Sequence, residues 1–168
     1  VLPIVEADLG ARCLCLSSVG LHYIDLNQPD VARVQIDTVS SLIADEEGLE
    51  TCVYCQHYLL CTRFYSAKHN PNEFYRNGVL YLKYVNQGTL TIGEKQELVM
   101  RLVIAALVGP KVYNFAELLT DPICEAVRAD AKAANMLRLL SAINTGDMRA
   151  FLSVRQELDA FFRSEPSL

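Results

Sequence analysis

The sequence lacks any long apolar run of the kind that crosses a membrane. No stretch of about 18 or more residues is free of charged and turn-forming residues, as a membrane-spanning helix would be. The longest apolar run, Leu102 to Gly109, is too short to cross a bilayer. The sequence therefore predicts no contact with the interior of a membrane.

Positive charge is also in short supply. The 15 Lys and Arg are outnumbered by 20 Asp and Glu, which gives a formal net charge of -5 and an isoelectric point near 5.2. The basic residues are scattered along the chain instead of forming a stripe, so they provide little attraction for a phosphate backbone. We therefore expect no direct nucleic-acid ligand.

The motifs of the common enzyme classes are missing as well. The sequence contains no phosphate loop of the G-x-x-x-x-G-K-[ST] kind, and no G-x-G-x-x-G, G-x-S-x-G or H-E-x-x-H motif. Its three histidines, His22, His57 and His69, lie outside any catalytic motif, and we interpret them as solvated or hydrogen-bonded. The sequence thus predicts a protein that is not an enzyme and that needs no cofactor.

Cysteine is the residue type that comes nearest to forming a site. The segment from Cys52 through Cys55 to His57, with Cys61 nearby, could supply soft ligands for zinc or a redox dithiol. The sequence lacks a second Cys-x-x-Cys motif, which would supply the other two ligands of a zinc site. One helix cannot bring the cysteines and His57 around a single ion. The acidic run 45–47 lacks the spacing of a calcium loop, so we predict no metal site. Buried, unreactive thiols in a reducing compartment are the favoured interpretation of Cys13, Cys15, Cys52, Cys55, Cys61 and Cys124.

Apolar residues recur at helical spacing throughout the chain, and no segment alternates as a strand does. Asn70 before Pro71, and Thr91 three residues before Glu94, are typical helix start signals. The third helix has two apolar stripes, one of them through Cys52, and we expect it to be an inner helix. Helices are expected at about 9–24, 30–44, 49–68, 71–88, 92–108 and 130–143, with two short helices after Pro110 and a last one from Met148.

The predicted helix pairs begin near residues 8, 49, 93 and 130, which is a period of about forty residues. Such a period is typical of hairpins that cover their apolar faces by stacking on one another. The sequence therefore predicts an all-α fold, a right-handed solenoid of TPR-like or HEAT-like helical hairpins. We expect a single helical-repeat domain over residues 1–168, with Phe161 and Phe162 facing a further domain.

Aromatic residues cluster on both sides of Asn70. They could line a groove for a peptide, since tyrosine offers a broad contact area at low entropic cost. Their helical spacing favours the other interpretation, in which they form the interior of two hairpins in contact. The residues concerned are Phe64, Tyr65, Phe74, Tyr75, Tyr81 and Tyr84.

Three segments resemble a known family, the helical-repeat part of proteasome lid subunits that carry a PCI module. The most specific segment runs from Val112 through Asn114, Phe115, Leu118 and Leu119 to Pro122. It departs from the family pattern at Ala116, where glycine is usual, and at Asp121, where histidine is common. The other segments are the aromatic hairpin with Phe64, Tyr65, Phe74 and Tyr75, and the helix break at Gly146 followed by Phe151.

The resemblance implies a non-catalytic scaffold subunit of the lid that acts in ubiquitin-dependent protein degradation. The expected partners are other lid subunits and the neighbouring ubiquitin receptor, and the expected compartments are cytoplasm and nucleus. We expect this chain to be a monomeric piece that lacks the winged helix of the family. A peptide adaptor near Tyr75 and Tyr81, or a PCI subunit of the signalosome or of a translation initiation complex, is the alternative.

Overall fold

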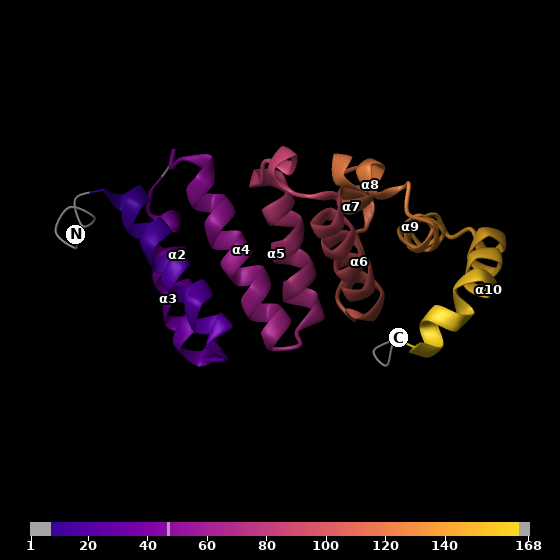
Figure 1. Cartoon of the computed structure of the whole chain (residues 1–168), viewed down its shortest axis with the longest axis horizontal. Helices are drawn as coiled ribbons and strands as arrows, with labels where there is room; N and C mark the ends of the chain where they lie inside the picture. Colours follow the sequence, from indigo (N-terminus) through magenta and orange to yellow (C-terminus); the bar gives the residue numbers. More distant parts are fainter. Residues whose placement is uncertain (1–7, 47, 165–168) are drawn as a thin grey trace. The chain divides into compact units, whose positions relative to one another are not determined.

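The computed structural model describes residues 8–46 and 48–164, apart from the side chains of residues 160–162 and 164. The chain divides into two compact units, Val1–Val85 and Asn86–Leu168 (Figure 1). Helices and turns, but no strands, make up the described ranges, so the predicted all-α helical-repeat class is confirmed. The expectation of one domain over the whole chain stays a prediction.

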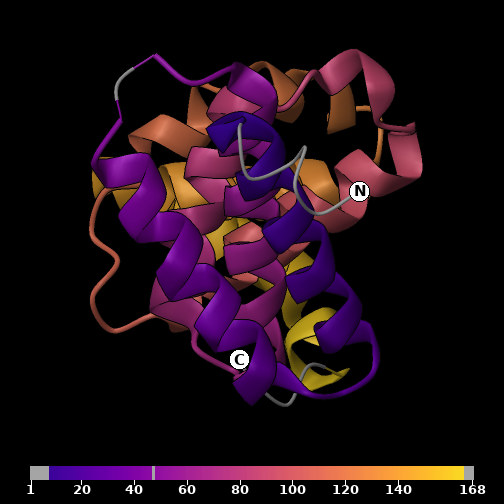
Figure 2. The ribbon, with the colours of Figure 1, turned by 90° about the vertical axis from the view of Figure 1, so that its left-hand side faces the viewer.

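The first unit consists of two helical hairpins. Its described helices are α2 Leu9–Asp25, α3 Pro29–Ala44, α4 Thr51–Ala67 and α5 Pro71–Tyr84. Figure 2 shows α2 and α3 side by side, and α4 packs against α2, α3 and α5. The prediction that the third helix is an inner helix is therefore confirmed.

Two clusters form the core of this unit. Ala32 and Ile36 of α3 meet Leu60 and Phe64 of α4, while Cys13, Val39 and Val53 form the second cluster. The close approach of α2 to α4 depends on Gly20, because a Cβ atom there would lie only 2.8 Å from a methyl carbon of Leu60. Glycine thus sets the distance between these two helices.

The second unit contains one long helix, two short ones and a closing hairpin. Its described elements are η1 Gln87–Thr89, α6 Ile92–Val108, α7 Ala116–Leu119, α8 Pro122–Val127, α9 Ala131–Thr145 and α10 Met148–Ser164. The core side chains Leu102, Leu118, Ile123, Met136 and Leu140 are almost fully buried. Helices α6, α7, α8 and α10 all contact α9.

The predicted helix starts are confirmed by their capping bonds. The Asn70 side chain accepts from the Glu73 amide at 3.3 Å, at the start of α5. Thr91 and Glu94 form a reciprocal capping box, in which the Thr91 amide donates to the Glu94 carboxylate at 2.8 Å. Gly146 ends α9 in the left-handed conformation, with φ 71°.

Two details of the expected helices are wrong. The fourth helix ends at Tyr84 instead of near Gly88, because Val85 is extended and the Asn86 side chain caps a separate turn by accepting from the Gly88 amide. In α4 neither predicted stripe is buried along its whole length, since Cys52 is exposed and Tyr54 and Tyr58 are half-buried. The buried positions are Val53, His57, Leu60, Cys61, Thr62 and Phe64.

None of the described helices combines the length and the apolar character that crossing a bilayer requires. The side chains of Phe161 and Phe162, for which we expect a further domain as neighbour, lie outside the described residues. The same holds for Glu47 in the acidic run.

Candidate interaction sites

The aromatic residues around Asn70 are mostly interior residues of the first unit. Phe64, Phe74, Tyr75 and Tyr81 are all buried, and Tyr65 is half-buried. The ring of Phe64 meets that of Tyr65 edge to face, with 5.1 Å between centroids. These residues therefore hold the hairpins together and leave little aromatic surface for a peptide near Tyr75 and Tyr81.

A half-exposed stack of three tyrosine rings joins α4 to α5. The ring of Tyr84 lies 5.1 Å from that of Tyr54 and 5.6 Å from that of Tyr58, with interplanar angles of 20° and 14°. Stacked rings add to the stabilisation that burial alone provides. The stack fixes the C-terminal half of α5 against α4.

A polar hollow of about 400 Å³ lies between α3, α4 and α5. On the α3 side, the Arg33 guanidinium pairs with Asp37 at 3.0 Å and donates to the Tyr65 hydroxyl at 3.3 Å. On the α5 side, Glu73 and Arg76 line the opposite wall. The charged side chains that line the hollow are thus two acids and two bases.

His57 and Cys61 form the floor of this hollow, a pair that we did not predict. His57 is only 6% exposed, and its Nε2 atom lies 3.4 Å from the Ser40 hydroxyl and 3.6 Å from the Cys61 sulfur. Its Nδ1 atom has no hydrogen-bond partner among the described atoms. His57 is therefore not solvated, and of the two ring nitrogens only Nε2 has the expected hydrogen-bond partners. The contact between His57 and Cys61 could have been predicted from their spacing, because residues four apart on a helix are neighbours.

The pair does not have the protonation states of a catalytic thiol and base. Burial lowers the pKa of His57 to about 4 and raises the pKa of the Cys61 thiol to about 12. At neutral pH the imidazole is uncharged and the sulfur keeps its proton, whereas nucleophilic attack requires a thiolate. The contact between them is a hydrogen-bond contact between two neutral groups.

Buried His57 should make the protein less stable in mild acid. An unfolded histidine takes up a proton below about pH 6.5, and the folded protein resists this until about pH 4. Stability is thus fully present above pH 6.5 and is lost as the pH falls toward 4. We expect a loss of about 2 kcal/mol between pH 7.5 and pH 5 from this residue. Urea unfolding at the two pH values measures it.

Two variants isolate the contribution of His57 from that of the carboxylates. His57→Gln should remove most of this pH dependence, whereas His22→Gln should leave it unchanged, because His22 is exposed. If His57→Gln loses as much stability in acid as the parent protein, the imidazole is not the cause.

The cysteines fall into two classes. Cys13, Cys61 and Cys124 are buried, as expected, but Cys15 and Cys52 are exposed and Cys55 is half-buried. The prediction of buried packing is wrong for Cys15, Cys52 and Cys55, because the surfaces of α2 and α4 on which they lie are not fully covered in the first unit. No group of three His, Cys, Asp or Glu side chains in the described part of the chain could hold a metal ion.

The segment before Pro122 forms a corner in the second unit. Phe115 is 9% exposed and Leu118 is completely buried, while Leu119 is half-buried. The exposed Asn114 accepts from the Ala116 amide at 3.1 Å at the start of α7. Pro122 is the exposed first residue of α8. The corner that the sequence predicts here is therefore present.

Side-chain bonds hold this corner in place. The Asp121 carboxylate caps α8 by accepting from the Ile123 amide at 2.9 Å, and it accepts from the Gln87 side chain at 2.7 Å. The buried Cys124 thiol donates to the Leu118 carbonyl at 3.1 Å. A histidine in place of Asp121 could not supply the same carboxylate, so Asp121 has a structural role here.

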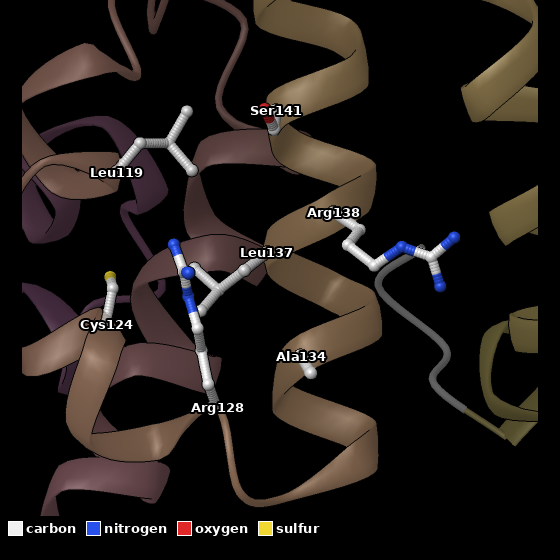
Figure 3. A pocket seen from close by; sticks show the side chains of 7 residues that line it. All are labelled: Leu119, Cys124, Arg128, Ala134, Leu137, Arg138 and Ser141. Carbon is white, nitrogen blue, oxygen red and sulfur yellow. The ribbon is translucent and has the colours of Figure 1, made fainter.

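A second hollow, of about 420 Å³, lies between this corner and α9 (Figure 3). Leu119 and Leu137 form its apolar part, and the Arg128 side chain extends beside Leu137 while Arg138 points away from it. Arg128 pairs with Glu125 at 3.1 Å and Arg138 with Glu157 at 3.7 Å.

The two remaining signature residues, Gly146 and Phe151, lie at the junction of α9 and α10. Gly146 ends α9, and Phe151 is half-buried in α10.

Comparisons with known proteins give one consistent result. Residues 6–140 match the family model described as PSD13 N-terminal repeats. The chain is 38% identical over 152 residues to the 26S proteasome non-ATPase regulatory subunit 13 of Dictyostelium discoideum. The aligned region covers 88% of this chain and 39% of the relative. It is 30% identical over 139 residues to the 26S proteasome regulatory subunit RPN9 of Saccharomyces cerevisiae, covering 82% of this chain and 35% of the relative. The chain thus spans less than two fifths of the length of these relatives.

Proposed function

The chain belongs to the family of PSD13 N-terminal repeats, and from this membership we propose that it is the helical-repeat part of a scaffold subunit of the proteasome regulatory lid. In this role it performs no chemistry and acts in ubiquitin-dependent protein degradation. The observation that carries the proposal is the match over residues 6–140, which includes both the aromatic hairpin and the Phe115 corner.

The structure of the chain is compatible with a scaffold. Its buried side chains serve hairpin packing, and its histidine–cysteine contact lacks an activated thiolate. The proposed partners are other lid subunits and the neighbouring ubiquitin receptor, and the proposed compartments are cytoplasm and nucleus. The signalosome and initiation-complex alternatives receive less support, because the curated relatives named above are proteasome regulatory subunits.

The peptide-adaptor alternative receives less support from the first unit. Tyr75 and Tyr81, the centre of that proposed groove, are buried, so their rings contribute no open surface. A peptide would have to use the polar hollow at Arg33 and Arg76 instead.

Co-sedimentation tests the proposal directly. The full-length protein, tagged in its source cell, should migrate in a particle of proteasome size together with other regulatory subunits. The tag alone, expressed in the same cells, is the control and should remain at the top of the gradient. A tagged protein that stays small and carries none of these subunits would contradict the scaffold function.

A further inference from the structure

Cys52 and Cys55 are two thiols that lie about one turn apart near the start of α4. Helix α4 begins at Thr51, so Cys52 is its second residue and Cys55 lies one turn later. Side chains three residues apart on a helix are neighbours, about 5 to 6 Å apart between Cβ atoms. Cys52 is exposed and Cys55 is half-buried, so small molecules in solution can reach the pair.

The first turn of a helix is where a disulfide between such neighbours can close. A disulfide needs Cβ atoms about 3.5 to 4.5 Å apart, which requires the turn to tighten. The Cys52 amide is among the first amides of the helix, which have no intrahelical partner, so a shift of Cys52 toward Cys55 breaks few bonds. The Val53 amide already donates to the Glu50 carbonyl at 2.9 Å, which is the tighter i to i+3 pattern.

The other described cysteines do not offer such a pair. Cys13, Cys61 and Cys124 are buried, and burial raises the pKa of the Cys61 and Cys124 thiols to about 12. Cys15 is exposed on α2, but its neighbour Cys13 points into the core two residues away. In the part of the chain that the structure describes, only Cys52 combines exposure with a second thiol on the same helix face.

We propose that Cys52 and Cys55 are a reversible dithiol–disulfide site that reacts with low-molecular-weight disulfides such as oxidised glutathione. The Cys52 thiolate attacks one sulfur of oxidised glutathione and displaces a glutathione thiolate, leaving a mixed disulfide. The Cys55 thiolate then attacks the Cys52 sulfur and displaces the second glutathione. The protein loses two electrons and two protons, and one oxidised glutathione becomes two reduced ones.

Glu50 keeps this site slow at neutral pH. The Cys52 thiol donates to a Glu50 carboxylate oxygen at 3.4 Å. The pKa of Cys52 is raised, first by partial loss of water contact and then by this hydrogen bond and the negative charge of Glu50. The raised pKa lowers the thiolate fraction of Cys52 at neutral pH, so exchange with oxidised glutathione is slow and its rate rises with the glutathione disulfide concentration.

Exchange with glutathione, followed by intact mass and peptide mapping, tests the proposal. The full-length protein is equilibrated with oxidised glutathione and acid-quenched. The parent protein should yield a peptide in which Cys52 is bonded to Cys55, with no glutathione on either residue, whereas the exposed Cys15 has no second thiol on its helix face and can retain one glutathione. Cys55→Ser should instead accumulate one glutathione at Cys52, whereas Cys15→Ser, which removes the other exposed thiol, should still close the disulfide.

The rate provides a second readout. Glu50→Gln removes the carboxylate that disfavours the Cys52 thiolate, so it should speed alkylation of Cys52 by iodoacetamide at pH 7. A parent protein that retains glutathione on Cys52, or whose peptide map shows no bond between Cys52 and Cys55, would overturn the proposal without any variant. So would a Glu50→Gln protein whose Cys52 reacts no faster than before.

Discussion

Replacing Phe115 with alanine should lower the free energy of unfolding by about 3 to 5 kcal/mol. The ring is 9% exposed and lies in the corner where α7 begins, next to the fully buried Leu118. Its removal exposes apolar surface and leaves a cavity that the short helices α7 and α8 cannot fill without losing their caps. Urea denaturation followed by circular dichroism measures the change.

Tyr113 provides the matched control for this prediction. It is an aromatic residue of the same segment but is 82% exposed, with its hydroxyl donating to the Pro110 carbonyl at 2.8 Å. Tyr113→Ala should therefore cost less than about 1 kcal/mol. Equal losses for the two variants, or an unchanged unfolding midpoint for Phe115→Ala, would show that Phe115 does not anchor the corner.

In the first unit, Leu60→Ala should cost about 2 to 5 kcal/mol. Leu60 of α4 is completely buried against α2 and α3, in the same core cluster as Ile36 and Phe64. Gly20→Ala should also destabilise the protein, by about 1 to 3 kcal/mol, because the new methyl group would lie 2.8 Å from a Leu60 methyl carbon.

A double variant tests whether the effect of Gly20→Ala comes from crowding against Leu60 or from the backbone. In Gly20→Ala with Leu60→Ala, the methyl group at residue 20 enters space that the leucine has vacated. The double variant should therefore lose less stability than the sum of the two single variants, and the difference measures the contact. Strict additivity would mean that Gly20 acts through its backbone and not through closeness to Leu60.

Helix starts could be predicted because their signals are local. Asn70 and Thr91 each bond to an amide three residues later, and such bonds depend on the sequence of one turn alone. The Phe115 corner was predictable for the same reason, since Pro110 and Pro122 limit the backbone on both sides.

The orientation of α4 about its own axis could not be predicted in this way. Its sequence has apolar residues on most of its surface, so several orientations bury similar amounts of it. Packing against α2, α3 and α5 selects Val53, Leu60 and Phe64 and leaves Cys52 outside. The polar hollow was missed for the same reason, because the inward position of His57 follows from that choice.

The helices of the first unit pack mainly on helices that are close to them in the sequence, and this favours rapid folding. The main helix contacts within the first unit join α2 to α3 and α4, and α4 to α3 and α5, so each of these contacts joins helices that are one or two apart along the sequence. Bringing such segments together requires closing only short loops, which costs little chain entropy and favours rapid folding. A chain emerging from the ribosome can therefore complete each hairpin as soon as its second helix has left the exit tunnel.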